Sequence, residues 1–333
     1  MPGPGPTIAD IARAAEVSTA TVSHALAGTG RLGDSTRRRV REVAAALGYS
    51  AARRGPRTRT LGLAVTTYAG SAWNFVEIAY FSRLLTAATA AAHAHGYALT
   101  VLPAERGAEP LWHTLAVDGM LLLDSPAGDP VLAALRARGL PLVFDGRPPD
   151  PRPADVWVDN DHEAATREVL DHLAAAGARR IALHAAYGRE HYTAAVGAAY
   201  GRWCAERGMA PLVVPFDPQD GAGHAFDPLF AAAGQRPDAV HCAYDPGGRQ
   251  VLAAAARHGL RVPEELLLVC ASEDPGYGWG EPAVTTLSLG PELVGERAVA
   301  ALVALVERPD DAPAPPAPVP TTLTPRASTH RRR

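Results

Sequence analysis

The sequence has no lysine and few cysteines. All 32 basic side chains are arginine, and none of the three cysteines (Cys204, Cys242 and Cys270) forms a C-x-x-C pair, which argues against a disulfide framework and a zinc site. Long apolar runs are also missing, since stretches such as residues 84–92 are too short to cross a bilayer. The start of the chain has neither the basic region nor the apolar core of a secretory signal. We therefore expect a cytoplasmic protein with no membrane partner.

The charge of the chain is unevenly distributed. The net charge is only -3, and the hydrophobic content of 47% is typical of a globular protein, whose 333 residues predict two or three domains. Residues 1–60, however, contain ten arginines and four acids, so they carry +6 and the remaining residues carry -9. A basic head on an acidic body predicts that the head binds nucleic acid and that the body has a different role.

The basic head is predicted to form three short helices. Each is expected to begin at a hydroxyl residue that caps it and precedes apolar residues at helical spacing, namely Thr7, Ser18 and Ser35. The second helix would cover residues 19–26, and only a tight turn at 16–17 separates it from the first. This arrangement is typical of a helix-turn-helix, whose second helix enters the major groove of DNA.

From residue 61 onward, apolar runs of strand length alternate with helical stretches. The expected strands cover residues 61–66, 97–102, 119–123, 140–144, 180–184, 211–214, 239–243 and 266–271. The expected helices lie near residues 76–94, 129–138, 161–176, 193–207, 248–258 and 291–307. This alternation predicts an α/β body of parallel sheets flanked by helices, in which ligands bind at the carboxyl ends of the strands.

Three runs in the head form a long and specific motif. They are TIADIARAAEVSTATVS at residues 7–23, STRRRV at residues 35–40 and LGY at residues 47–49. Together they closely resemble the LacI/GalR family of bacterial transcription regulators. Weaker matches extend over the body, at residues 117–123, 139–143, 156–160, 177–182 and 285–286.

The resemblance implies both a fold and a function. The fold would be a helix-turn-helix head followed by a two-lobed body similar to periplasmic sugar-binding proteins. Such proteins act as homodimers on pseudo-palindromic operators in double-stranded DNA, usually as repressors. A small effector molecule binds in the cleft between their lobes.

The expected DNA contacts lie mainly on the second helix of the head. Thr19 and Ala20 occupy the positions where the family reads base edges, and both would favour apolar contact with a thymine methyl group. His24 stands where the family usually has arginine, so the operator sequence cannot be carried over. Small hydroxyls beside them suit phosphate oxygens. The expected set is Thr7, Ser18, Thr19, Ala20, Thr21, Ser23, His24, Arg31, Thr36, Arg53 and Arg54.

The linker over residues 50–60 departs from the family pattern. The resemblance implies a longer segment that begins Pro-Asn and forms a hinge helix, whose leucine wedges into the minor groove; residues 50–60 contain no such dipeptide and no leucine. Two interpretations stay open for the linker arginines, Arg53, Arg54, Arg57 and Arg59. Either they enter a narrow minor groove or contact phosphates, or the segment is a plain solvated tether. In both cases we expect weaker bending of the DNA.

Effector-binding residues are expected where the strands of the body end at the cleft. Acids and aromatic rings suit a sugar, because carboxylates accept hydrogen bonds from hydroxyls and rings stack on C–H faces. Val196 and Leu289, however, replace a usual arginine and glutamine of the family, which favours a less polar ligand or the loss of effector control. Each acid also has the simpler interpretation of a strand-end or capping residue. The expected set is Trp73, Asn74, Phe75, Asp124, Asp145, Arg147, Val196, Tyr244, Asp245, Glu273 and Trp279.

The domain boundaries follow from these assignments. We expect a DNA-binding domain over 1–49, the linker over 50–60, an effector-binding and dimerisation domain over 61–325 and a disordered tail over 329–333. In the body, the N-lobe would comprise 61–158 and 286–320, and the C-lobe 159–285 and 321–328. The expected helix near 76–94 is apolar over much of its circumference, so it either lies between the subunits or packs only on its own sheet.

Nothing in the sequence indicates an enzyme. Gly28, Gly30 and Gly33 match G-x-G-x-x-G, but they follow a predicted helix instead of a strand, so they form a loop between helices. We expect no catalytic residue, cofactor or metal. The alternative function is that of a free solute-binding protein without a DNA role, which the fused head and the missing export signal disfavour. The operator, the effector, the direction of its effect and the choice between dimer and tetramer stay open.

Overall fold

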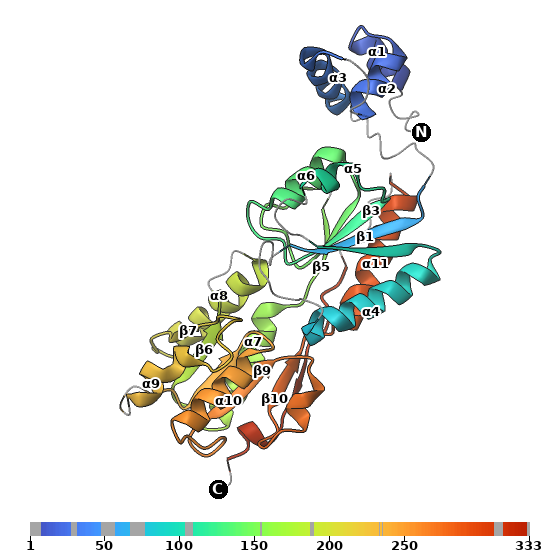
Figure 1. Cartoon of the computed structure of the whole chain (residues 1–333). Coiled ribbons are helices and arrows are strands. Elements are labelled where there is room, and N and C mark those ends of the chain that lie inside the picture. The colour runs from blue at the N-terminus through green and yellow to red at the C-terminus, as the bar shows by residue number, and fades with distance from the viewer. Residues whose placement is uncertain are drawn as a thin grey trace.

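The computed structural model describes residues 8–27, 32–47, 57–66, 77–103, 109–153, 155–186, 190–232, 234, 236–309 and 316–331. A small helical head precedes a body of two α/β lobes, and the C-terminus lies at the far end of the second lobe (Figure 1). The predicted fold class is therefore confirmed. None of the helices in these ranges is long and apolar enough to span a bilayer.

The head is a bundle of three helices, α1 (Ile8–Ala14), α2 (Thr19–Ala27) and α3 (Asp34–Ala46). One apolar face of each helix supplies the buried core, which includes Ile11, Ala15, Val22, Ala25, Val40 and Ala44. α3 begins two residues earlier than expected, because the carbonyl of Gly33 accepts the first helical hydrogen bond from Arg37 N at 3.1 Å. Ser35 therefore lies inside the first turn and does not cap the helix.

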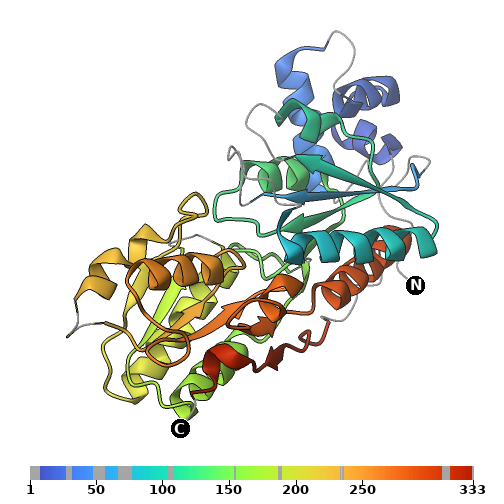
Figure 2. The same cartoon turned by 60° about the horizontal axis from the view of Figure 1, so that its bottom comes forward.

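The first lobe contains a parallel sheet in the order β2-β1-β3-β4-β5. Its strands are β1 (Thr60–Val65), β2 (Ala98–Pro103), β3 (Gly119–Leu123), β4 (Leu142–Asp145) and β5 (Val156–Val158). Helices α4 (Ala79–Ala94) and α11 (Pro291–Glu307) lie side by side on one face, and α5 (Glu109–Thr114) and α6 (Pro130–Arg138) cover the other (Figures 1 and 2). Successive side chains of β3 alternate between these two cores, as expected for a sheet buried on both faces.

The second lobe contains a sheet in the order β11-β10-β9-β8-β6-β7, in which only β11 is antiparallel. Its strands are β6 (Ile181–Ala185), β7 (Val213–Pro215), β8 (Ala239–Cys242), β9 (Leu267–Ala271), β10 (Thr285–Ser288) and β11 (Thr322–Thr324). Helices α7 (His162–Ala175) and α8 (His191–Glu206) pack on one face, and α9 (Asp227–Ala231) and α10 (Gly247–Arg257) on the other. Short 3-10 helices are η3 (His224–Phe226), η4 (Pro275–Gly278) and η5 (Ala327–Thr329).

The chain crosses between the lobes three times, and Asn160 ties the crossings together. The crossings lead from β5 to α7, from β10 to α11, and through residues 316–321 to β11. Asn160 Nδ2 donates to the carbonyls of Leu289 and Val319, each at 2.9 Å, so one amide connects all three segments. The second crossing follows Ser288, slightly later than the expected residue 286, because residues 285–287 pair with β9.

The C-terminal residues up to Arg331 pack against the second lobe. Thr329 is buried, and its hydroxyl lies 2.8 Å from Thr285 Oγ1 and 2.9 Å from His172 Nε2. The guanidinium of Arg331 donates to three backbone carbonyls of the lobe. The expectation of a disordered tail is therefore wrong for residues 329–331, because they satisfy polar groups of the lobe; residues 332–333 lie outside the described ranges.

Candidate functional site

The second helix of the head begins at a capped and exposed N-terminus. Ser18 Oγ accepts a hydrogen bond from Thr21 N at 3.1 Å and lies 2.8 Å from Thr21 Oγ1, so Ser18 is the N-cap of α2. Thr19, Ala20 and Ser23 are exposed, as is His24. The opposite side of α2 is buried in the head core. This surface therefore offers backbone N–H groups and hydroxyls to an incoming oxyanion.

The remaining head residues of the expected DNA-binding set have different positions. Thr36 lies in the first turns of α3 and is half-buried. Thr7, Arg31, Arg53 and Arg54 lie outside the described residues. The structure thus brings together Ser18, Thr19, Ala20, Thr21, Ser23 and His24 on one short helix.

An arginine of α3 fixes the position of the turn before α2. Arg39 Nη2 donates to the backbone oxygen of Ala15 at 2.5 Å and to Glu16 Oε2 at 3.1 Å. Glu16 has a left-handed backbone with φ of 50°, which lets the chain turn sharply from α1 to α2. The hydrogen bond from the Arg39 guanidinium to the carbonyl of Ala15 holds α3 against the turn between α1 and α2, and it therefore orients α2.

The last residues of the linker are docked on the first lobe. Asp118 accepts hydrogen bonds from Thr58 N at 2.8 Å and from Arg59 N at 2.9 Å. Arg57 donates to the carbonyls of residues 306 and 307 at the C-terminus of α11, and Arg59 forms an ion pair with Glu307 at 3.4 Å. The positive charge of an arginine is favourable at a helix C-terminus, because that end of the helix dipole is negative. In this structure Arg57 and Arg59 are held against α11, whereas Arg53 and Arg54 lie outside the described residues.

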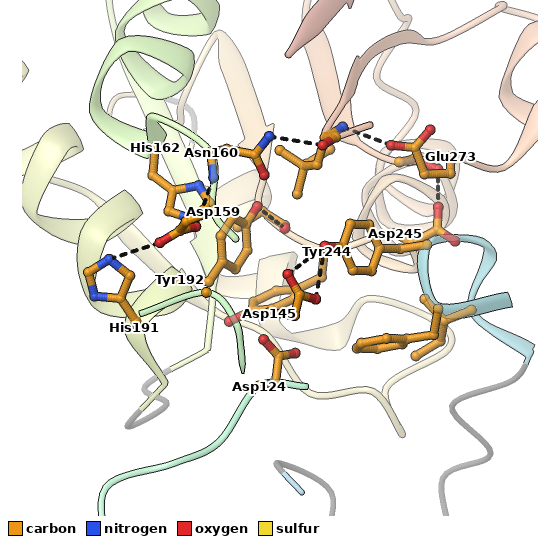
Figure 3. A pocket seen from close by; sticks show the side chains of 18 of the residues that line it. Asp124, Asp145, Asp159, Asn160, His162, His191, Tyr192, Tyr244, Asp245 and Glu273 are labelled. Carbon is orange, nitrogen blue, oxygen red and sulfur yellow. Dashed lines mark hydrogen bonds and ion pairs between the residues drawn. The ribbon is translucent and has the colours of Figure 1, made fainter. Parts of the chain in front are cut away.

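A cleft of about 890 Å³, measured out to its open mouth, lies between the two lobes. Parallel strands of both lobes end at it, which is where α/β folds place ligands. Six of the expected effector-binding residues line it: Asp124, Asp145, Arg147, Tyr244, Asp245 and Glu273. Figure 3 shows these acids around a central group of aromatic rings.

One wall of the cleft is organised around Asp159. His162 Nε2 lies 2.7 Å from Asp159 Oδ1 and His191 Nε2 lies 3.5 Å from Asp159 Oδ2, so the two rings face this carboxylate from α7 and α8 (Figure 3). Burial by itself would raise the pKa of Asp159, but the hydrogen bond and the charge of His162 outweigh it and lower that pKa overall. Backbone N–H groups of Arg147 and Asn160 complete its partners. Asp159 is thus an ionised and fully satisfied group.

The floor of the cleft carries two carboxylates without such partners. Tyr80 donates its hydroxyl to both oxygens of Asp145, at 3.0 and 2.9 Å, yet burial and the nearby charge of Asp124 raise the pKa of Asp145 well above its usual value. Asp124 follows β3 with a left-handed backbone, φ of 51°, and accepts no hydrogen bond from any described residue. Burial, followed by the charge of Glu190, raises the pKa of Asp124 to about 7.

The acids of the opposite wall are bound within the second lobe. Glu273 accepts hydrogen bonds from Ser288 Oγ at 2.9 Å and Leu289 N at 2.8 Å. Asp245 bonds Ser272 Oγ and accepts the backbone N–H of Ala79 at the start of α4, which is a contact between the lobes. Burial raises the pKa of both carboxyls, and these partners oppose the shift.

Comparison with known proteins matches both parts of the chain. Residues 7–51 match the model of bacterial regulatory proteins of the lacI family, and residues 170–329 match the periplasmic binding protein-like domain. The chain is 25% identical over 334 residues to the HTH-type transcriptional repressor PurR of Glaesserella parasuis, which covers 93% of each protein. It is 28% identical to PurR of Escherichia coli O1:K1 over 88% of each. The chain therefore combines a helix-turn-helix domain of the lacI family with a periplasmic binding protein-like domain.

Solved structures of the family share the fold. The complex of the transcriptional regulator CelR with cellobiose superposes with a TM-score of 0.73 at 25% identity, covering 97% of this chain and 99% of the other. The lac repressor dimer bound to operator and an anti-inducer gives a TM-score of 0.67 at 21% identity over 98% and 99% of the two chains, which shows the fold alone. The family consists of regulators and not of enzymes.

Two expected cleft residues of this chain lie elsewhere. Val196 is 3% exposed and packs in the core of the second lobe, because its face of α8 is turned to the sheet. Trp279 is 81% exposed at the end of η4 and is not among the lining residues. Trp73, Asn74 and Phe75 lie outside the described residues.

Several lining residues were absent from the expected set. They include Tyr80, Asp159, Asn160, His162, His191 and Tyr192. The sequence carries a signal for some of them, since Asp159 and Asn160 directly follow the apolar run at 156–158, and ligands of α/β folds bind at the ends of strands. Tyr80 and Tyr192 belong to helices, where the strand-end rule does not apply.

Proposed function

We propose that this LacI-family protein is a cytoplasmic, sequence-specific DNA-binding transcriptional regulator that acts as a repressor. It binds a pseudo-palindromic operator as a homodimer and responds to a small molecule in the cleft between its lobes. The observation that carries the proposal is the exposed side of α2 with its Ser18 cap, fused to a body with a cleft. The names of the relatives support it, since PurR is a repressor and the CelR structure holds cellobiose.

The head supplies modest specificity by itself. Thr19 and Ala20 cannot make bidentate hydrogen bonds to a base, and the hydroxyls of Ser18, Thr21 and Ser23 suit phosphates. One helix of nine residues touches few base pairs, so two heads on two half-sites are needed to distinguish an operator from the rest of a genome. The lac repressor structure, a dimer on its operator, supports this arrangement.

Helix α11 links the cleft to the linker. Its N-terminal end follows Leu289, whose N–H is held by Glu273 and whose carbonyl is held by Asn160. Its C-terminal end accepts Arg57 and pairs Glu307 with Arg59. A ligand that changes the angle between the lobes would move this helix and with it the point where the linker leaves the body. The effect on DNA is then a population shift between two spacings of the heads.

The lining of the cleft favours a polar effector over an apolar one. Of the residues that suggested a less polar pocket, Leu289 lines the cleft and Val196 and Trp279 do not, whereas Trp73 and Phe75 lie outside the described residues. The described lining instead contains five carboxylates, together with tyrosine and histidine side chains. Groups of this kind accept hydrogen bonds from a ligand rich in O–H or N–H donors, such as a sugar.

A gel-shift assay of the full chain on DNA upstream of its own gene, with unlabelled competitor DNA, tests the proposal. Thr19→Asp places a negative charge in the first turn of α2, where it favours the helix but repels phosphates. Ala164→Asp makes the same change in the first turn of α7, on the body. We expect Thr19→Asp to abolish the specific shift and Ala164→Asp to retain it. Equal binding by the two variants, or no specific shift by the unmodified chain, would contradict the proposal.

A further inference from the structure

The carboxylates of the cleft differ sharply in how well they are partnered. Asp159, Asp245 and Glu273 each have side-chain and backbone donors within the protein. Asp145 has only the hydroxyl of Tyr80, and Asp124 has no hydrogen-bond donor among the described residues. The two poorly partnered acids lie close together, since the charge of Asp124 raises the pKa of Asp145 and that of Tyr80. Within the described part of the chain, the floor of the cleft therefore has acceptor oxygens without a donor (Figure 3).

The charges that face Asp124 do not neutralise it. Glu190 at the start of α8 and Asp159 both oppose its ionisation, and only His162 of α7 favours it. His162 is already directed to Asp159 through Nε2. Arg147 lies at the cleft, but its guanidinium is placed over the ring of Trp157 at 5.8 Å and forms no ion pair with a described residue. A buried carboxylate in such surroundings is costly unless a cation arrives.

Aromatic rings stand beside these acids. Tyr192 and Tyr244 meet edge to face with ring centroids 5.8 Å apart, and both line the cleft. The Tyr192 hydroxyl is occupied by the carbonyl of Ala243 at 2.7 Å, and that of Tyr244 by Thr193. Their polar ends are therefore used within the protein, and the rings are left to contact a ligand by their faces and edges. Such rings attract a cation as well as the C–H faces of a sugar ring.

We propose that the ligand of the cleft carries a protonated amine, which binds at the floor between Asp124 and Asp145, and that an amino sugar or a compact amine that carries an aromatic ring is the class of molecule recognised. This inference rests on the proposed effector role of the cleft. A neutral sugar supplies hydrogen-bond donors but no charge. An ammonium group supplies both, and it relieves the repulsion among the acids on the floor.

Calorimetric titration of the full chain at pH 7 tests the class of ligand with three matched pairs. The amines are D-glucosamine, D-galactosamine and tyramine, and their neutral counterparts are D-glucose, D-galactose and tyrosol. We expect at least one amine to bind ten-fold or more tightly than its counterpart. Because burial raises the pKa of Asp124 to about 7, part of the carboxyl is protonated at pH 7, and binding of an amine should release that proton. The measured binding enthalpy should then vary with the ionisation enthalpy of the buffer.

Two variants assign the effect to the floor. Asp124→Asn should weaken the amine at least ten-fold and leave the neutral counterpart unaffected. Asp150→Asn removes an equal charge from an exposed position of the same lobe and should change neither. Thermal melting of each variant verifies that it is folded.

The proposal is overturned if the neutral member of every pair binds as tightly as its amine, if no amine binds below 10 mM in concentration, or if Asp124→Asn leaves the amine affinity unchanged. The gel shift separates this failure from that of the proposed function. Specific DNA binding with no preference for amines would reject the ligand class alone. Absence of specific DNA binding would reject the regulator, whatever the titrations show.

Discussion

Replacing Asp124 by asparagine should stabilise the unliganded protein, and increasingly so as the pH rises. Burial raises the pKa of Asp124 from its ordinary 3.8 to about 7, with a further contribution from the charge of Glu190. The folded state therefore binds this proton more tightly than the unfolded state. The stability that the group contributes is full below pH 3.8 and is lost as the pH rises through about 7. Roughly three pKa units at about 1.4 kcal/mol each give about 4 kcal/mol, which water in the open cleft reduces to about 2–4 kcal/mol.

Urea unfolding of both proteins between pH 5 and pH 8, followed by tryptophan fluorescence, measures this difference. We expect the free energy of unfolding of Asp124→Asn to exceed that of the unmodified chain by more at pH 8 than at pH 5, because the loss begins above pH 3.8 and is complete only above about pH 7. The control Asp150→Asn removes the same charge from an exposed position of the same lobe. If the difference for Asp124→Asn is flat over this range, the carboxyl is not held in an unfavourable environment, and the reasoning about the floor of the cleft is refuted.

Three further changes test the head, the linker and the packing of the first lobe. Ser18→Ala removes the N-cap of α2 and should cost about 1 kcal/mol of head stability, measured by thermal melting, with a weaker gel shift. Asp118→Ala removes the acceptor of two linker amides and should accelerate their hydrogen exchange by ten-fold or more, whereas unchanged exchange would show that the linker is held by its arginines alone. Gly295→Ala places a Cβ 2.7 Å from a backbone oxygen of α4 and should cost about 1–3 kcal/mol in urea unfolding. Gly201→Ala, with nothing within 4 Å of the added carbon, is its control and should stabilise α8 by up to about 1 kcal/mol.

Most of the body was predictable because its strands are buried on both faces. Continuous apolar runs such as residues 119–123 form strands over the predicted range, and the helix predicted at 291–307 is found unchanged. The elements that were not predicted are short, and they include β5 with three residues, β10 with four, α9 with five and α5 with six. Runs of this length carry too few residues to establish a period, and their structure comes from pairing with a neighbouring strand or packing in the lobe.

The sequence predicted cleft residues correctly only where the residue lies at the end of a strand. Asp124 and Asp145 follow strands of the first lobe and reach the cleft by that rule. The pairing of Asp159 with His162 and His191 joins a crossing segment to two helices, so it depends on how the lobes close. Val196 was carried over from a family position, but its side chain lies in the core because that face of α8 is turned to the sheet.

Some of the arginines that make the head basic form contacts within the protein. Residues 1–60 carry an excess of +6, but part of that charge serves the protein itself. Arg39 clamps the turn before α2, and Arg57 and Arg59 fix the linker to α11, where Glu307 neutralises one of them. The number of phosphates that the head neutralises is therefore smaller than its arginine count, and the salt dependence of operator binding should be correspondingly shallow. Replacing Arg39 should alter the stability of the head, and only arginines that contact DNA should change the slope of affinity against salt.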